Sequence, residues 1–171
     1  MKFTKRLIKG KLIKRYKRFF ADINLNKEII TAHCPNTGSM MGLLNTNNDV
    51  WISKNNDPKR KLKFTLEIIK VKNNLVGVNT HLANKIVYHA LSNNLINELN
   101  YNKNIKAEVF FNKKTRFDFL IEKNNQKSFV EVKNVTLCRK DKISEFPDAI
   151  TSRGSKHLKT LIDAIKKGYK S

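Results

Sequence analysis

Residues 115–133, with the sequence TRFDFLIEKNNQKSFVEVK, carry the pattern that decides the fold of the C-terminal half of this chain. Their apolar runs predict two strands, over residues 115–121 and 128–137. Residues two apart in a strand face the same side, so Glu131 and Lys133 are expected to project together. A neighbouring strand can bring Asp118, thirteen residues before Glu131, to the same place. The stretch therefore predicts two carboxylates and an ammonium group at one site.

Asp118, Glu131 and Lys133 are the residue types that metal-dependent cleavage of a phosphodiester requires. Two carboxylates supply the hard oxygen ligands that Mg²⁺ prefers. The metal neutralises phosphate charge and acidifies a bound water, while the ammonium group orients that water or the transition state. We predict Asp118 and Glu131 as metal ligands, Mg²⁺ as the cofactor, and all three residues as catalytic. The spacing resembles the core of the PD-(D/E)XK nucleases.

A plainer interpretation of the same residues stays open. The chain has 28 lysines, so an acid followed by Glu-x-Lys arises by chance in many such sequences, and Glu131 with Lys133 suits an exposed ion pair. Against this, apolar residues flank both acids, and a carboxylate in such a setting usually has a ligand or partner. Glu108, on the preceding strand, is a further candidate acid whose alternative is an ordinary solvent-facing residue.

The segments around this stretch predict an α-β-β-β-α order. A strand over residues 105–111 precedes it, joined by a tight Asn-Lys-Lys turn. Before that strand, apolar residues recur at helical spacing after Asn79, with Thr80 as a possible N-cap, and residues 95–99 suit a second short helix. A last helix is expected over residues 152–167, ended by Gly168. Its apolar stripe consists of Leu158, Leu161, Ile162 and Ile165.

The N-terminal half predicts a small β-barrel or sandwich. Alternation of apolar and polar residues over 19–25 has the two-residue period of a half-buried strand. A helix over residues 5–20 is the rival interpretation for the start of the chain. Further short strands are expected at residues 28–32, 49–53, 64–72 and 75–78. The change of pattern after Asn79 divides the chain into domains at residues 1–79 and 80–171.

Composition points to a polyanionic partner. Thirty-five basic residues face fourteen acidic ones, a formal charge of +21. Such a surface attracts nucleic acid first and an anionic membrane second. Lys and Asn, with 28 and 22 copies, dominate the polar residues, so the codon bias of an AT-rich genome explains part of the charge.

Cysteine usage and hydropathy predict a cytoplasmic protein. Cys34 and Cys138 lie far apart, without metal-ligand spacing and without an expected disulfide. No stretch approaches the ~20 apolar residues of a membrane span. Residues 1–20 carry nine basic residues and no acid, so a transit peptide is the alternative, although the stretch runs directly into strand-like sequence.

Three basic clusters are candidate contacts for nucleic-acid phosphates. Two lie in the expected barrel, the first interleaved with aromatic residues that either stack on bases or fill the barrel core. The third opens the last helix, whose N-terminus favours anions. The loop at residues 33–38 either presents backbone amides to a phosphate or is a structural turn with Cys34 packed inward. The candidates are Lys14, Arg15, Lys17, Arg18, Lys59, Arg60, Lys61, Arg153, Lys156 and His157.

The sequence also resembles the sugar fermentation stimulation protein A (SfsA) family over almost its whole length. The matching blocks include residues 12–19, 32–40, 51–53, 59–61, 78–80, 116–119, 130–137, 146–151, 153–154 and 156–158. The resemblance implies an N-terminal OB-like barrel, a C-terminal domain similar to PD-(D/E)XK nucleases, and sequence-tolerant DNA binding with a regulatory link to maltose and sugar metabolism. It places Asp118, Glu131 and Lys133 at the family's nuclease-like positions.

Two departures from the family pattern affect these expectations. Ser152 and Ser155 stand where the family usually has Glu and Gln, and the family pattern continues past Ser171 with another hydrophobic strand. We therefore predict an α+β fold, an OB-like barrel followed by a partial PD-(D/E)XK nuclease-like αβββα domain. The expected partner is DNA, with RNA as an alternative. The candidate functions are a DNA-binding regulator, a Mg²⁺-dependent endonuclease and a basic RNA-associated protein.

Overall fold

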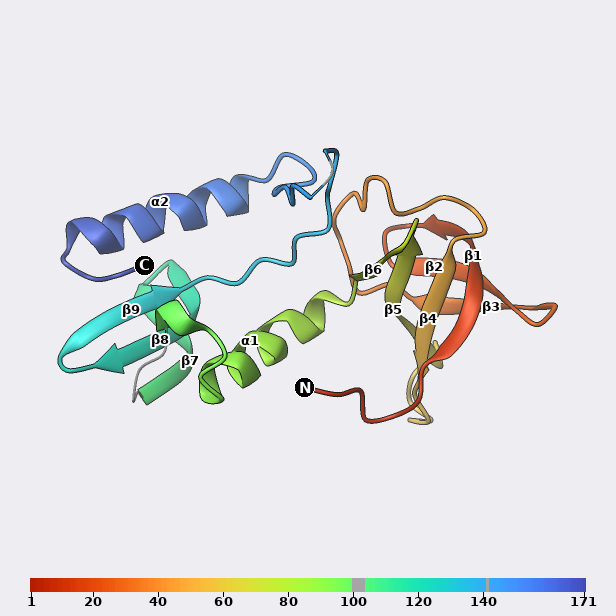
Figure 1. The fold of residues 1–171 in the computed structure, drawn as a ribbon, viewed down its shortest axis with the longest axis horizontal. Coiled ribbons are helices and arrows are strands. Elements are labelled where there is room, and N and C mark those ends of the chain that lie inside the picture. Colours follow the sequence, from red (N-terminus) through yellow and green to blue (C-terminus); the bar gives the residue numbers. More distant parts are fainter. Residues whose placement is uncertain (100–103, 141) are drawn as a thin grey trace. The chain divides into compact units, whose positions relative to one another are not determined.

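The computed structural model describes residues 1–99, 104–140 and 142–171, which form two compact units (Figure 1). The first unit comprises Met1–His81 and Asn134–Ala149, and the second comprises Leu82–Lys133 and Ile150–Ser171. The sequence predicted a single division near residue 79. The structure adds two further crossings, because residues 134–149 return to the first unit after the third strand of the second, and residues 150–171 then return to the second.

The first unit is a β-barrel with an OB-like strand order. Its sheet has the order β3-β2-β1-β4-β5-β6, and β3 also pairs with β5 in parallel, at Ala32 with Phe64 and His33 with Thr65. That pairing closes the first five strands into a barrel, as predicted. The strands are β1 (Ile8–Tyr16), β2 (Phe20–Leu25), β3 (Glu28–His33), β4 (Asp49–Lys54), β5 (Phe64–Val71) and β6 (Asn74–Gly77).

The start of the chain is a strand and not a helix. β1 pairs with both β2 and β4, and a turn at Lys17 and Arg18, with φ values of 46° and 62°, connects it to β2. Two residues with positive φ match the twist of a tight hairpin, which a helix over residues 5–20 would not allow. Gly10 lies where β2 crosses closely, since a Cβ there would be 2.6 Å from side-chain atoms of Ile23 and Leu25.

The loop after β3 is held by side chains, which favours the structural interpretation of residues 33–38. Cys34 is fully buried, with its Sγ 3.6 Å from the Sδ of Met40. The Gly38 amide donates to Asn36 Oδ1 at 2.9 Å, and the Met40 amide donates to Asp148 Oδ2 at 2.9 Å. A Cβ on Gly38 would lie 2.7 Å from Asp148 Oδ2. The returning segment therefore completes this loop of the barrel.

The second unit has the predicted αβββα order, with an antiparallel sheet β7-β8-β9. The 3₁₀ turn before its first helix begins at Thr80, but Thr80 does not cap that helix. Its hydroxyl donates to the carbonyl of Pro35, while the residue preceding the helix is Leu82, which provides no side-chain cap. The elements are η1 (Thr80–Leu82), α1 (Ala83–Ser92), η2 (Asn97–Leu99), β7 (Asn104–Asn112), β8 (Thr115–Lys123), β9 (Gln126–Val130) and α2 (Ser152–Lys166).

Strand β9 (Gln126–Val130) is shorter than the predicted strand over residues 128–137, because its backbone pairing with β8 ends at Val130. The last ladder pair joins Phe119 to Val130. Beyond it, the amide of Val132 donates to the Asp118 carboxylate at 2.6 Å in place of a backbone carbonyl. Residues 131–137 therefore follow the strand rather than extend it, and Glu131 and Lys133 lie just past its end.

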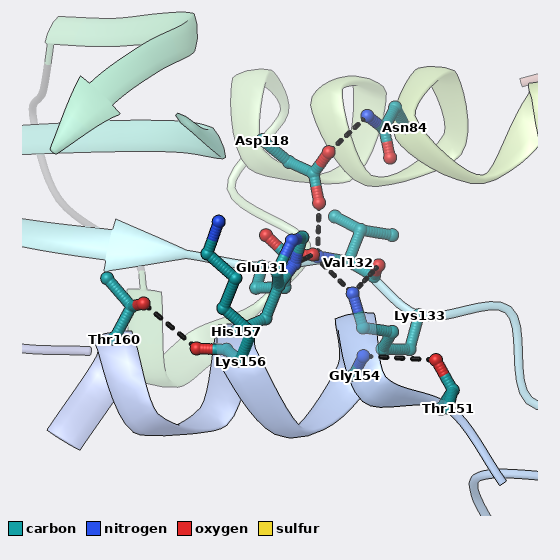
Figure 2. Close-up of polar contacts among 10 residues, drawn as sticks. All are labelled: Asn84, Asp118, Glu131, Val132, Lys133, Thr151, Gly154, Lys156, His157 and Thr160. Carbon is teal, nitrogen blue, oxygen red and sulfur yellow. Dashed lines mark hydrogen bonds and ion pairs between the residues drawn. The ribbon is translucent and has the colours of Figure 1, made fainter. Parts of the chain in front are cut away.

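Two apolar clusters join the helices of the second unit to the sheet. One contains Phe117, Leu120 and Phe129 with Ala164 of α2, and the other contains Phe119 and Ile121 with Leu91 of α1. Figure 1 shows the three strands between the green α1 and the blue α2. The starts of α1 and α2 lie on either side of the end of β9, where the candidate site lies (Figure 2).

The apolar stripe predicted to bury α2 is mostly exposed. The helix exists and ends as expected, with Gly168 at φ +83° directly after it. Its buried residues, however, are the small or polar Gly154, His157, Thr160 and Ala164. The predicted stripe residues Leu158, Ile162 and Ile165 are between 51% and 60% exposed, whereas Leu161 packs against the Phe117 cluster as predicted.

Both cysteines are free, Cys34 buried and Cys138 exposed. Within the described ranges, no helix combines the length and the apolar character needed to cross a membrane.

Candidate functional site

A hollow in the second unit gathers the acids predicted from the sequence together with a rim of basic residues. It lies between the start of α1, the β7–β8 hairpin, the end of β9 and the first turns of α2. Its lining consists of Asn84, Glu108, Phe110, Lys113, Lys114, Thr115, Arg116, Asp118, Glu131, Ser152, Arg153, Lys156 and His157.

Asp118 is held by a hydrogen bond on each oxygen. Asn84 Nδ2, in the first turn of α1, donates to Oδ1 at 2.8 Å, and the Val132 amide donates to Oδ2 at 2.6 Å. Figure 2 shows the carboxylate between these two donors. Two neutral donors therefore orient the carboxylate at the wall of the hollow.

Glu131 has a buried side chain, and two basic side chains share it. Its side chain is 7% exposed, and its Oε1 contacts both Lys133 Nζ and His157 Nδ1. Lys133 comes from the same extended segment, and His157 from the second turn of α2 (Figure 2). A buried carboxylate is costly unless it is paired, and this pairing satisfies that requirement.

The structure thus brings Asp118, Glu131 and Lys133 to one place, and their catalytic roles stay a prediction. Lys133 is 31% exposed at its side chain, so its ammonium group remains partly open to solvent. Glu108 also lies on the hollow, where its carboxylate pairs with Arg116 Nε at 2.8 Å.

Asp118 and Glu131 form a donor set suited to a hard divalent cation. The described ranges hold no group of three or more His, Cys, Asp or Glu side chains that would enclose a metal by protein ligands alone. Mg²⁺ usually takes one or two carboxylates and completes its shell with waters and substrate phosphates. Two carboxylates at an open hollow fit that requirement.

The start of α2 places the third predicted basic cluster on the same hollow. Thr151 caps the helix by accepting the Gly154 amide at 3.1 Å. Arg153 and Lys156 then line the hollow, and Lys156 Nζ donates to the carbonyl of Lys114 at 3.0 Å. His157 is 9% exposed and faces Glu131, so its first role in this structure is as a partner of that carboxylate.

The first two predicted basic clusters, residues 14–18 and 59–61, lie in the first unit. Some of their side chains already bind other groups of the protein. Arg15 donates to the carbonyls of Arg18 and Asn36, and Arg60 donates to Thr65 Oγ1 at 3.3 Å. Lys14 lies 3.9 Å from Asp22. The exposed candidates of these clusters are Lys14, Lys17, Arg18, Lys59 and Lys61.

Several residues of the hollow were not predicted from the sequence. Asn84 carries no distinguishing signal, because it is one of 22 asparagines and meets Asp118 only after folding. Lys113, Lys114 and Arg116 did form a visible basic group at the hairpin turn. Phe110 stood in a predicted strand, where an aromatic residue is expected to be buried.

Comparisons with known proteins cover both units. Residues 13–78 match the model of the SfsA N-terminal OB domain, and residues 81–171 match the model of the sugar fermentation stimulation protein RE domain. The chain is 75% identical over 171 residues to a sugar fermentation stimulation protein homolog of Pelagibacter ubique, covering 100% of this chain and 74% of that protein. A Marinomonas homolog is 46% identical over 174 residues, covering 100% and 67%.

A solved structure shows the same fold. The structure of Pyrococcus furiosus SfsA in complex with Ca²⁺ superposes with a TM-score of 0.85 at 24% identity, covering 99% of this chain and 71% of that one. The resemblance recognised in the sequence is confirmed by these matches. This chain belongs to the sugar fermentation stimulation protein (SfsA) family.

Proposed function

We propose that this chain binds nucleic acid in a sequence-tolerant way and that the hollow of the second unit cleaves phosphodiester bonds with a divalent cation. The observation that carries the proposal is the pairing of opposite charges at one place. Two carboxylates, Asp118 and Glu131, lie on a hollow whose rim is basic. A cation held by the acids and a phosphate backbone held by the rim satisfy both sets of charges.

A divalent cation bound by Asp118 and Glu131 would neutralise phosphate charge and make water a better nucleophile. The Ca²⁺ complex of the Pyrococcus furiosus relative supports a hard-cation site in this fold. Asn84 and the Val132 amide keep the Asp118 carboxylate oriented. Lys133, held next to Glu131, would stabilise the charge that develops on the phosphate in the transition state.

The rim residues would hold the flanking phosphates. Within the described ranges, no carboxylate lies at ion-pair distance from Lys113, Lys114 or Arg153, so their charge is available to a ligand. Phosphate contacts of this kind position a strand without reading its sequence. The name of the family's relatives refers to sugar fermentation, and we propose that such an effect follows from nucleic-acid binding rather than from contact with a sugar.

Lys133→Ala is expected to lower Mg²⁺- or Mn²⁺-dependent cleavage of labelled DNA by about 100-fold, because it removes one donor to the transition state. Lys159→Ala, which removes an exposed lysine of α2 outside the hollow, is the matched control and should cut like the wild type. Equal cutting by the Lys133 variant and the wild type would assign the activity to a contaminant.

Nucleic-acid binding is expected to weaken steeply with salt. If the chain neutralises about six phosphates of a duplex, log affinity should fall against log salt with a slope of about −5, since each contact releases a counterion. Fluorescence anisotropy in a metal-chelating buffer measures this without cleavage. A flat salt dependence would contradict the proposal, and competition with RNA at fixed salt would test the preference for DNA.

A further inference from the structure

Phe110 is an exposed aromatic ring on the same hollow. It lies on β7, is 67% exposed, and belongs to the residues that line the hollow with Asp118 and Glu131. Its neighbour Phe111 instead packs on the aromatic core, with ring centroids 5.7 Å from Phe117. A single exposed apolar residue needs no explanation by itself. Phe110, however, lies beside the basic residues and the two acids of the hollow, so a ligand bound there would contact its ring.

The surroundings of Phe110 orient the ring and place a cation beside it. Phe110 is paired across the strands with Arg116, whose guanidinium carbon lies 5.7 Å from the ring centroid. Arg116 is in turn fixed by Glu108, at 2.8 Å from Nε to Oε2. Glu108 has φ +56°, a left-handed conformation that is uncommon for residues with a Cβ. The ring, the guanidinium and the carboxylate thus form an ordered group at the rim.

An exposed aromatic ring next to phosphate-binding cations suits an unpaired nucleobase. Proteins that bind single strands combine a basic groove with rings on which bases stack. In a duplex the faces of the bases are already covered by their neighbours, so such a ring finds no free face. Lys113 and Lys114, at the hairpin turn next to Phe110, supply the phosphate contacts that this mode needs.

We propose that Phe110 stacks on an unpaired base and that the hollow therefore takes a single strand, or an unpaired end, in preference to a continuous duplex. This proposal depends on one part of the proposed function, the binding of nucleic acid at the hollow. It does not depend on cleavage. Insertion of Phe110 between paired bases as a wedge is the competing mode, and it would favour a duplex.

The spectroscopic test uses Phe110→Trp. Trp51 is the single tryptophan of the chain, so Phe110→Trp in a Trp51→Phe background places the only indole at the hollow. Titration with a single-stranded oligodeoxynucleotide in a chelating buffer should quench its fluorescence saturably, and the matched duplex should quench it less. Leu158→Trp in the same background, at a 60% exposed position of α2 outside the hollow, should show no quenching. Equal quenching by duplex and single strand overturns the proposal.

The affinity test uses Phe110→Ala and Phe110→Tyr. We expect Phe110→Ala to weaken binding of the single strand about 10-fold, Phe110→Tyr to keep it, and neither to change binding of the duplex. Unchanged binding of the single strand by Phe110→Ala, or an equal loss for both substrates, overturns the stacking role. Because no cation is present, the result is independent of cleavage. If the wild type does not cut DNA with Mg²⁺ or Mn²⁺ but these binding differences are observed, the proposed cleavage is refuted and the stacking role of Phe110 is supported.

Discussion

Asp118→Asn is expected to lower metal-dependent phosphodiester cleavage by about 100-fold or more, because even residues that support a metal ligand typically contribute 10- to 100-fold. It should also destabilise the second unit by about 1–3 kcal/mol, the usual cost of an unsatisfied polar group. Both oxygens of Asp118 accept hydrogen bonds, from Asn84 and from the Val132 amide. An asparagine has one acceptor oxygen, so its amide group would face one of these two donors.

A reciprocal exchange separates the two effects. In the double variant Asn84→Asp with Asp118→Asn, donor and acceptor change places, and the hydrogen-bonding pattern is restored. Stability should return towards that of the wild type, as measured by urea unfolding, while cleavage stays lost because the charge has moved off the ligand position. Recovery of cleavage together with stability would contradict the assignment of Asp118 itself as a metal ligand.

Phe117→Ala is expected to destabilise the second unit by about 3–5 kcal/mol, since it removes a large side chain from a packed core. Phe117 is fully buried, with ring centroids 5.2 Å from Phe129 and 5.7 Å from Phe111. Ala164 of α2 packs in the same cluster, so loss of the Phe117 ring should also weaken the packing of α2 on the sheet.

The two units offer separate probes for this measurement. Trp51 lies on β4 of the first unit, whereas both α-helices lie in the second. The helical signal in far-ultraviolet circular dichroism should therefore follow the second unit, and Trp51 fluorescence the first. Separate probes are needed because unfolding of two units is not necessarily two-state. Phe110→Ala is the matched control and should change stability by less than about 0.5 kcal/mol. A helical transition unmoved by Phe117→Ala would refute the packing described for this core.

Periodicity predicted the elements better than it predicted their buried faces. The alternation of apolar residues identified the barrel strands, because each strand has one face in a single core. In α2 the same reasoning held only for Leu161, since the buried residues of the helix are Gly154, His157, Thr160 and Ala164. A Cβ on Gly154 would lie 2.7 Å from Cγ2 of the capping residue Thr151, and His157 is the partner of Glu131. A stripe of large apolar residues does not reveal either requirement.

The site was predictable only where its residues are close in sequence. Glu131 and Lys133 are two positions apart, and Asp118 lies one hairpin away, so strand geometry was enough to bring them together. The link from Asn84 to Asp118 spans 34 residues, and that from Glu131 to His157 spans 26. Such pairs depend on where α1 and α2 begin against the sheet, and a single sequence contains no signal for that packing.

The discontinuity of the first unit has a consequence for synthesis on the ribosome. The six strands of the first unit are complete at Gly77, yet the Met40 amide is satisfied by Asp148, 108 residues further along the chain than Met40. At usual elongation rates Asp148 is translated on the order of ten seconds after the last barrel strand. During that time the loop between Cys34 and Met40 lacks its hydrogen bond to Asp148. The first unit is therefore completed only after the three strands of the second unit have been synthesised.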